Sequence, residues 1–324
     1  MTTLAPRPGW VLRSVARLAL LAAASAFLAF LFGLIGRWWW LADLFSHFRV
    51  QYFFVLVICA LALFASRHHR KGLAAIFAAL VVGGSIVHYT GWPLQQAQAT
   101  GADFRFVTFN QHFSNRDPAR IGRYLEGLRA YVVTMQEVPS RDVVQALAEN
   151  LPSYPHVYGD AQFPYGAVMF SRWPIIDART VNLAPDGARA SMVVIDRAGS
   201  RVAVMGVHLR WPMGPGNSHL RDAELERLIA AARDIREPLL IGGDMNITPW
   251  SPVFRHHVDE SPLRDCARGM GLTNTWPSRF PPLGIRIDQC LASDHWRVLA
   301  IDRGPWLGSD HLPTITDLQL NAGP

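Results

Sequence analysis

Cysteine is scarce in this sequence of 324 residues: only three occur, and their spacing does not match a zinc site. Cys59 lies within a long apolar stretch, which leaves Cys266 and Cys290. These two could pair if their part of the chain faces an oxidising compartment, although their spacing does not require it. Internal repeats and low-complexity tracts are also absent, which argues against a repeat architecture.

Most of the chain has no excess of positive charge, although the net charge of the whole sequence is +6. Residues 1–100 contain eight Lys or Arg against one acidic residue, Asp43, and so carry +7. Residues 101–324 contain 23 Arg against 24 Asp or Glu, and so carry −1. The basic character therefore supplies no overall attraction of this larger part to nucleic acid, although a local basic groove stays open.

Long apolar runs are confined to the first hundred residues. We interpret three stretches, at about residues 11–35, 51–66 and 72–90, as transmembrane helices. They lack charged residues at mid-depth, the usual mark of a transport path, so an anchor is the simpler interpretation. The alternative, buried helices of a soluble bundle, is disfavoured because such continuous apolar runs are rare in soluble cores. We expect the first helix to stay uncleaved, because no clean cleavage site follows it.

Basic residues predict the orientation of these helices. Arg7, Arg13 and Arg17 surround the start of the first helix, and residues 67–71 form a basic turn after the second. The positive-inside rule places both segments in the cytoplasm, and three spans then place residues 92–324 on the far side. We therefore predict a multi-pass protein of the inner (cytoplasmic) membrane, with its C-terminal domain extracytoplasmic, on the periplasmic side.

The pattern changes after residue 92. Residues 1–92 form the predicted anchor, 93–103 a linker and 104–324 one further domain. Helical patterns cover 141–150 and 218–236, and helix starts occur at Asp117-Pro118 and Ser251-Pro252. The β-rich runs are 105–109, 131–135, 166–170, 191–195, 202–207, 239–241 and 287–291. Strands outnumber helices and alternate irregularly with them, which favours an α/β sandwich of mixed sheets over a doubly wound parallel sheet.

Polar side chains recur where the apolar strands end. A strand buries its middle but can present its end to a cleft. Taken singly, each such residue has an ordinary interpretation as a turn, cap or surface group. Together they supply one Glu, three Asp, two His and two Asn in equivalent positions, which indicates a site. These residues are Asn110, Glu137, His208, Asp244, Asn246, Asp288, Asp310 and His311.

This inventory suits the hydrolysis of phosphate esters. Carboxylates such as those of Glu137 and Asp310 match Mg²⁺ or Mn²⁺, which neutralise charge on phosphoryl oxygens. Asp244 could orient and deprotonate the attacking water. An Asp behind a His fixes the imidazole tautomer and raises its basicity, as Asp288 could do for His311. Neutral donors such as Asn246, and the imidazoles, could hold the phosphoryl oxygens.

Seven short motifs follow one another in an order typical of a known family. They are Thr108–Asn110, Met135–Glu137, Gly166–Arg172, Val207–Leu209, Gly243–Asn246, Arg286–Asp288 and Ser309–Pro313. On these motifs, residues 105–318 resemble the endonuclease/exonuclease/phosphatase superfamily, and most closely its membrane-linked bacterial members described as YafD-like. The resemblance implies a four-layer sandwich of two packed mixed β-sheets flanked by helices, here preceded by three transmembrane helices.

The resemblance also implies roles for single residues. Glu137 would bind the divalent cation with help from Asn110 and Asp310. Arg189 resembles an arginine that contacts the substrate phosphate in some members. His112 stands where some AP endonucleases carry a second acid, so the resemblance does not imply a second metal ion.

The remaining implied roles concern the reaction itself. Asp244 would position the nucleophilic water, with Asn246 and His208 on the phosphate. His311, paired with Asp288, would act on the phosphate or as an acid/base.

The substrate stays open between nucleic acid, phospholipid and other phosphate esters. Genomic repair fits poorly with a near-neutral domain tethered to a bilayer outside the cytoplasm. Trp211, Trp250, Trp276 and Trp306 could line a cleft or touch lipid, although scattered aromatics are more often core or rim. No protein partner is evident. The alternative function is a catalytically idle, membrane-tethered binding module, disfavoured because competent residues fill all seven motifs.

Overall fold

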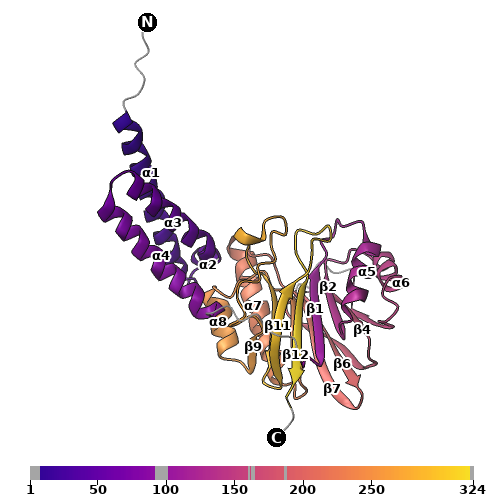
Figure 1. Ribbon diagram of the computed structural model, residues 1–324. Coiled ribbons are helices and arrows are strands. Elements are labelled where there is room, and N and C mark those ends of the chain that lie inside the picture. The colour runs from indigo at the N-terminus through magenta and orange to yellow at the C-terminus, as the bar shows by residue number, and fades with distance from the viewer. Residues whose placement is uncertain (1–7, 92–100, 160, 162–164, 186–187, 322–324) are drawn as a thin grey trace. The chain divides into compact units, whose positions relative to one another are not determined.

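The computed structural model describes residues 8–91, 101–159, 161, 165–185 and 188–321. It divides into two compact units (Figure 1), which we call the helical unit and the sandwich unit. The helical unit is Met1–Tyr89 with Trp250–Pro252, and the sandwich unit is Thr90–Pro249 with Val253–Pro324. Residues 93–100 of the expected linker lie outside the described residues, and the domain boundaries stay a prediction.

The helical unit buries many alanines between its helices and turns many large apolar side chains outward. Its helices are α1 (Pro8–Gly33), α2 (Trp40–Ser46), α3 (Arg49–Ala65) and α4 (His69–Thr90). Ala19, Ala60 and Ala79 are among the buried residues between these helices. Leu21 and Phe77, by contrast, are exposed. Small residues inside and large apolar residues outside suit a lipid environment better than water.

Two helices of this unit are long and apolar enough to cross a membrane. They are α4 and the Gly9–Gly33 part of α1. α2 and α3 meet the same test only together, and they are bent by 62° where they join. The described part of the chain therefore has two candidate spans, or three if the bent pair crosses as one. The sequence predicted the second span at residues 51–66 alone. The Trp38–Trp40 cluster resembles a connection at the membrane surface, so the short helix that starts at Trp40 was not anticipated.

The sandwich unit is built on two six-stranded sheets. The first has the strand order β11-β12-β1-β2-β4-β3 and the second β5-β6-β7-β8-β10-β9. The pairs β1–β2 and β7–β8 are parallel, and the other pairs are antiparallel. Both sheets are therefore mixed, as expected. The strands of the first sheet are β1 (Phe104–Asn110), β2 (Val132–Gln136), β3 (His156–Gly159), β4 (Ala167–Ser171), β11 (Trp296–Arg303) and β12 (Thr314–Leu320). Those of the second are β5 (Ile175–Asn182), β6 (Arg189–Arg197), β7 (Ser200–His208), β8 (Leu239–Asp244), β9 (Leu263–Asp265) and β10 (Asp288–Ser293).

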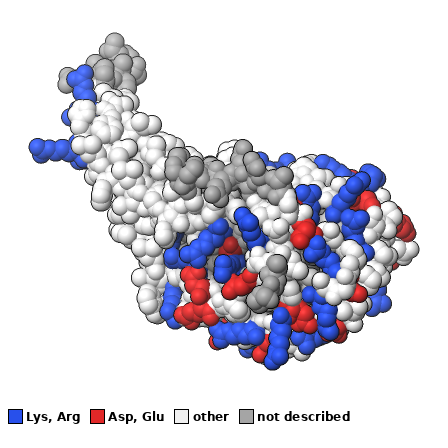
Figure 2. All heavy atoms as spheres, turned by 60° about the horizontal axis from the view of Figure 1, so that its bottom comes forward, with Lys and Arg blue, Asp and Glu red and all other residues white. Residues whose placement is uncertain are grey.

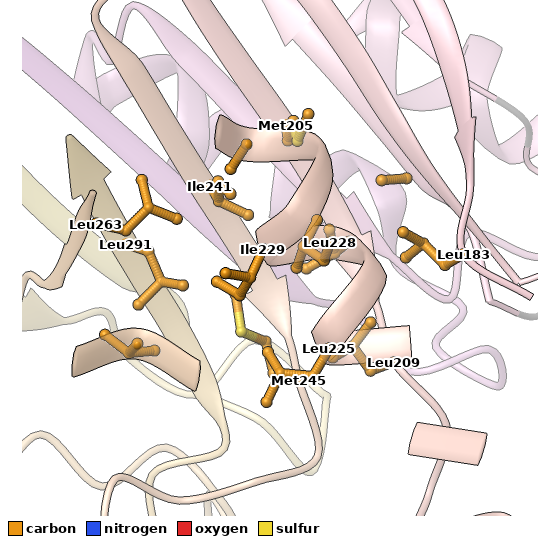
Figure 3. Packing of buried hydrophobic residues seen from close by; sticks show 14 of the residues in the cluster. Leu183, Met205, Leu209, Leu225, Leu228, Ile229, Ile241, Met245, Leu263 and Leu291 are labelled. Atoms are coloured by element: carbon orange, nitrogen blue, oxygen red, sulfur yellow. The ribbon is translucent and has the colours of Figure 1, made fainter. Parts of the chain in front are cut away.

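Helices cover the outer faces of the two sheets. Between the sheets lies an apolar core that includes Phe106, Val204 and Leu240. The helices are α5 (Pro118–Leu128) and α6 (Arg141–Glu149) on the first sheet, and α7 (Gly214–Arg233) and α8 (Pro252–Asp259) on the second. In Figure 3 the α7 side chains Leu228 and Ile229 lie against the outer face of the second sheet, the face that the helices bury. This confirms the expected sandwich of two mixed sheets flanked by helices.

Local signals placed several helix starts correctly. The carboxylate of Asp117 accepts a hydrogen bond from the backbone N–H of Arg120 and caps α5, as predicted. α7 begins at Gly214, four residues before the expected Ser218, because Pro215 is tolerated in a first helical turn. It ends at Arg233 rather than at Arg236. Five strands were not expected: β3, β5, β9, β11 and β12.

Strand register brings the polar strand ends together. β1 and β2 are parallel, and Asn110 pairs with Gln136 at their last residues. β7 and β8 are parallel as well, and His208 pairs with Asp244 at theirs. β12 is antiparallel to β1 and runs away from this end toward the C-terminus (Figure 1). The predicted site residues therefore collect at one end of the sandwich.

Candidate active site

Three neighbouring strands of the second sheet present a row of polar side chains. Asp244 at the end of β8 pairs with His208 of β7 on one side and with Asp288 of β10 on the other. Directly opposite residues in a sheet project to the same face. All three are buried, so the row forms the floor of the site.

Asn110 connects this row to the first sheet. Its Nδ2 donates to Oε1 of Glu137 and to Oδ2 of Asp244, both at 3.0 Å. The Asn110 side chain is itself held, because its Oδ1 accepts from the backbone N–H of His112 at 3.0 Å. Ser309 fixes the backbone by donating to the Asn110 carbonyl oxygen at 2.7 Å. One amide donor therefore sets the spacing of two carboxylates that come from different sheets.

Backbone strain gathers at the same place. Three of the six non-glycine residues with positive φ in the described part of the chain lie here: His112, Glu137 and Asn246, with φ of 65°, 54° and 51°. This left-handed conformation is costly for residues with a side chain and persists where the surroundings enforce it, often at functional sites. It turns the chain directly after β2 and β8, so that Glu137 and Asn246 face the row formed by His208, Asp244 and Asp288.

Asp244 is the centre of the cluster. Its Oδ1 accepts from the backbone N–H of Asn246 at 2.9 Å. Its Oδ2 lies 3.7 Å from Nε2 of His208 and 3.7 Å from Nε2 of His311. Burial raises the pKa of Asp244 to about 6, although the facing imidazoles favour its charged form. A carboxylate with a pKa closer to neutrality is a stronger base.

His311 forms a pair with Asp288. Its Nδ1 donates to Oδ2 of Asp288 at 2.9 Å, and the same oxygen accepts from the hydroxyl of Thr275. Burial alone would lower the pKa of His311, but the charges of Asp288 and Asp244 outweigh burial and raise it to about 10. His311 therefore carries a proton at neutral pH, with Nε2–H directed to the Asp244 side of the site.

The residues present fit a divalent cation. Asp244, Asp288 and His311 offer three potential ligand atoms within 4.8 Å of one another, and while His311 is protonated the two carboxylates are the ligands of this group that stay available to a cation. Glu137 supplies a further carboxylate, joined to Asp244 through Asn110. Oδ1 of Asp288 is buried without a hydrogen-bond partner among the described residues, which leaves it free to bind a cation. Clustered carboxylate oxygens are the donors that Mg²⁺ and Mn²⁺ prefer.

Three predicted site residues stand at the margin of the cluster. The exposed carboxylate of Asp310 accepts from Nε1 of Trp276 at 3.1 Å, and it makes no hydrogen bond to Glu137 or Asn110 in the described part of the chain. Its metal role stays a prediction. The Nδ2 of Asn246 donates to the Leu209 carbonyl oxygen at 2.9 Å, which holds the amide beside Asp244.

Arg189 is the third of these residues and begins β6. It precedes by two residues Ser191, which pairs with Gly206 of β7. Together with Asn182 and Arg227 it lines a surface hollow of about 450 Å³. Its proposed contact with the substrate phosphate stays a prediction.

Two links support Asp288: the Asp265–Arg286 ion pair, which sequence reasoning missed, and the Cys266–Cys290 disulfide, which the sequence left open. The buried side chains of Asp265 and Arg286 form an ion pair, with Nη1 of Arg286 donating to Oδ1 of Asp265 at 2.8 Å. A disulfide joins Cys266 to Cys290, with the two Cα atoms 5.4 Å apart. Both links tie β9 to the segment around Asp288. Arg286 was visible as part of a motif, whereas Asp265 carried no sequence signal, because its partner lies 21 residues further along the chain.

Comparisons with known proteins agree with this geometry. Residues 107–311 match the model of the Endonuclease/Exonuclease/phosphatase family. No curated protein matches the sequence significantly. Among solved structures, an endonuclease/exonuclease/phosphatase from Beutenbergia cavernae has a TM-score of 0.58 and 24% identity, and the match covers 69% of this chain and 73% of that one.

Two further solved structures share the fold at lower identity. The mannosyl-6-phosphatase of Bacteroides thetaiotaomicron has a TM-score of 0.55 and 17% identity over 67% of this chain and all of that one (100%). A humanized TDP2 of D. rerio has a TM-score of 0.56 and 15% identity over 67% of this chain and 98% of that one. The family match spans more than half of the chain and ends at His311, so it contains every residue of the buried cluster. This chain therefore belongs to the endonuclease/exonuclease/phosphatase family, whose members hydrolyse phosphate esters.

Proposed function

We propose that this protein is a divalent-metal-dependent phosphoesterase, anchored in a membrane, that cleaves phosphodiester or phosphomonoester bonds by attack of water. The observation that carries the proposal is the placement of Asp244. This buried carboxylate lies between the His311–Asp288 pair and the Asn110–Glu137 pair. Such a site holds a base and an acid on either side of one small space, as hydrolysis requires.

The cation is proposed to be Mg²⁺ (or Mn²⁺), held by Glu137 with Asn110 and Asp310. When bound, it would neutralise charge on the phosphoryl oxygens. The Asp244 carboxylate takes a proton from the attacking water, helped by its raised pKa. Asn246 and His208, and Arg189 at the margin, hold the phosphoryl oxygens by hydrogen bonds.

Proton delivery falls to His311 in this proposal. Nε2–H of the imidazolium donates its proton to the leaving oxygen as the P–O bond breaks. Asp288 keeps hold of the Nδ1 proton at 2.9 Å, which fixes the tautomer and the orientation of the ring. Asp244 then carries the proton taken from water and His311 has lost one, so passage of that proton from Asp244 to Nε2 of His311, 3.7 Å away, restores both groups for the next turnover.

The membrane part of the proposal rests on the helical unit. Its outward-facing large apolar residues and its candidate spans support an anchor in the inner membrane. If the α2–α3 pair crosses as one span, the sandwich unit is extracytoplasmic, and the Cys266–Cys290 disulfide supports that side. These features would suit the membrane-linked YafD-like members of the family.

The test is hydrolysis by the purified full chain in detergent. The panel contains bis-p-nitrophenyl phosphate, p-nitrophenyl phosphate, plasmid DNA and phospholipid, each with Mg²⁺, Mn²⁺ or EDTA. We expect metal-dependent turnover of at least one substrate, and a fall of about 10²- to 10⁴-fold in Asp244→Asn, because the base is lost. Asp234→Asn, the same change at an exposed aspartate, should match the native chain. A complete lack of metal-dependent turnover, or equal turnover in Asp244→Asn, would overturn the proposal.

A further inference from the structure

Large apolar side chains are exposed on the loops at the catalytic end of the sandwich unit. We call this set the apolar rim: Phe113 (63% exposed), Trp211 (62%), Met213 (56%), Phe280 (56%), Leu283 (42%) and Trp306 (42%). Single exposed apolar residues are ordinary on a protein surface. A group of six gathered on loops around one site is not, and such groups mark an interaction surface.

The rim begins directly beside the site. The backbone N–H of Phe113 donates to Oε2 of Glu137, the proposed metal ligand, at 3.0 Å, so Phe113 lies next to that carboxylate. Trp211 and Met213 project from the loop that follows His208, and Asn246 is bonded to that loop at Leu209. The rim therefore extends from residues that contact the reacting groups.

Hydrogen bonds join the remaining rim loops into one support. The Trp306 carbonyl oxygen accepts from Nη2 of Arg120 at 2.9 Å, on the helix that follows the Phe113 loop. The loop that carries Phe280 and Leu283 is held by Ser278, whose N–H and hydroxyl donate to the backbone oxygens of Asp310 and Ser309 at 2.7 Å each. The exposed side chains of the apolar rim therefore belong to loops whose backbone is held by hydrogen bonds.

Arginines accompany the aromatic side chains. The guanidinium groups of Arg120 and Arg279 lie 5.3 and 5.4 Å from the centre of the Trp306 ring. Aromatic rings with a polar edge, together with nearby cations, suit the boundary between lipid head groups and acyl chains, where phosphates meet hydrocarbon. The opposite end of the sandwich unit, turned toward the viewer in Figure 2, shows Lys or Arg and Asp or Glu interspersed. That mixed surface is typical of a face kept in water.

The bilayer is the surface always within reach of these loops, if the helical unit spans it. The 13 residues 91–103 between α4 and β1 can extend over at most about 45 Å. We propose that the apolar rim docks on the lipid surface and that the substrate class of the site is a lipid carrying a phosphate ester. This proposal rests on the proposed phosphoesterase function and names its substrate.

Docking is tested with the full chain reconstituted in phospholipid vesicles. With Cys59 replaced by Ala, an environment-sensitive fluorophore is attached at Phe280→Cys or, as a matched control, at Ile176→Cys, an exposed apolar position on β5. Vesicles containing spin-labelled phospholipid should quench the fluorophore at position 280 several-fold more strongly than at 176. Equal quenching at both positions, or none at 280, would overturn the docking proposal.

Substrate class is tested by activity in the same vesicles. Phe280→Ser and Trp306→Ser should lower phospholipid turnover about tenfold or more and leave bis-p-nitrophenyl phosphate turnover unchanged, whereas Ile176→Ser should change neither. Equal loss on both substrates would refute a rim role. Loss confined to an oligonucleotide substrate would instead mark the aromatics as a base-stacking platform and overturn the lipid assignment. Failure of the phosphoesterase proposal itself has a different signature, namely bis-p-nitrophenyl phosphate turnover that is absent or insensitive to Asp244→Asn.

Discussion

At the scale of single residues, the site contains more carboxylates than positively charged groups or hydrogen-bond donors to balance them. Glu137, Asp244 and Asp288 face one imidazolium, His311, and a second imidazole, His208. Buried carboxylates at this spacing repel one another unless a cation or a donor lies between them. Asn110 supplies one donor to two of them, and a divalent cation would supply the rest.

This charge balance predicts that the cation stabilises the fold. Mg²⁺ in the millimolar range should raise the melting temperature of the full chain by roughly 5 °C, because a ligand present at 100 times its Kd stabilises by about 2.7 kcal/mol. Glu137→Gln should lose most of that shift, since one anionic ligand is removed. Glu149→Gln, at an exposed acid in α6, serves as the control and should keep it. A shift in Glu137→Gln as large as in the native chain would exclude Glu137 as a ligand.

The Asp288–His311 pair gives a second prediction at this scale. Asp288→Asn removes the charge that keeps His311 protonated and oriented, so kcat should fall about 10²-fold or more while KM changes little. The measurement is steady-state kinetics on bis-p-nitrophenyl phosphate. Asp302→Asn, at an exposed position on β11, should behave like the native chain. A kcat unchanged by Asp288→Asn would show that His311 does not act as the acid.

At the scale of elements, two parallel strand pairs end at the candidate active site. β1 with β2 and β7 with β8 finish at the same end of the sandwich, and the sheets come close behind it. Gly242 allows this approach, because a Cβ there would overlap the ring of Phe106. Gly243, with φ of 155°, leads the chain into Asp244.

Gly243→Ala should therefore destabilise the sandwich unit strongly. An added Cβ would overlap the carbonyl oxygen of Val207 in the neighbouring strand, and the backbone conformation also disfavours a side chain. We expect the free energy of unfolding to fall by about 3 kcal/mol or more. The measurement is urea unfolding monitored by tryptophan fluorescence. Gly216→Ala in α7, where a Cβ would meet open space, should change stability by no more than about 1 kcal/mol. Similar midpoints for the two variants would contradict this role of Gly243.

At the scale of the whole molecule, the number of spans decides the compartment. α1 and α4 alone would return the chain to the side on which it started, whereas the bent α2–α3 pair adds a third crossing if it passes through. The basic turn at residues 67–71 favours three crossings under the positive-inside rule. The Cys266–Cys290 disulfide favours an oxidising side for the sandwich unit.

Both arguments predict an extracytoplasmic sandwich unit. A reporter that folds only outside the cytoplasm, fused after Pro324, should be active, and the same reporter fused after Ser66 should be active only if the second crossing is incomplete. Thiol titration of the denatured chain, purified without reductant, should find one free thiol, that of Cys59, and three after reduction. Three free thiols before reduction, with an inactive C-terminal reporter, would place the unit in the cytoplasm.

The candidate site could be proposed from the sequence because its residues are local features. A polar residue directly after an apolar strand is visible without a structure, and Asn110, Glu137, His208 and Asp244 all follow this pattern. The structure confirms the mixed-sheet sandwich that the irregular order of strands and helices favoured. The edge strands escaped notice, because short or exposed strands such as β5 and β9 lack a continuous apolar run.

By itself the sequence determined which segments are apolar, where the buried strands lie, and which side chains stand at their ends, because these features depend on neighbouring residues. Only the tertiary structure decided which side chains bond to one another around the site. The Asp265–Arg286 pair, the Thr275 hydroxyl on Asp288 and the indole of Trp276 on Asp310 join residues 13 to 34 positions apart. Such contacts depend on how loops close over the sheet ends, and loop closure is set by packing of the whole unit rather than by local preference.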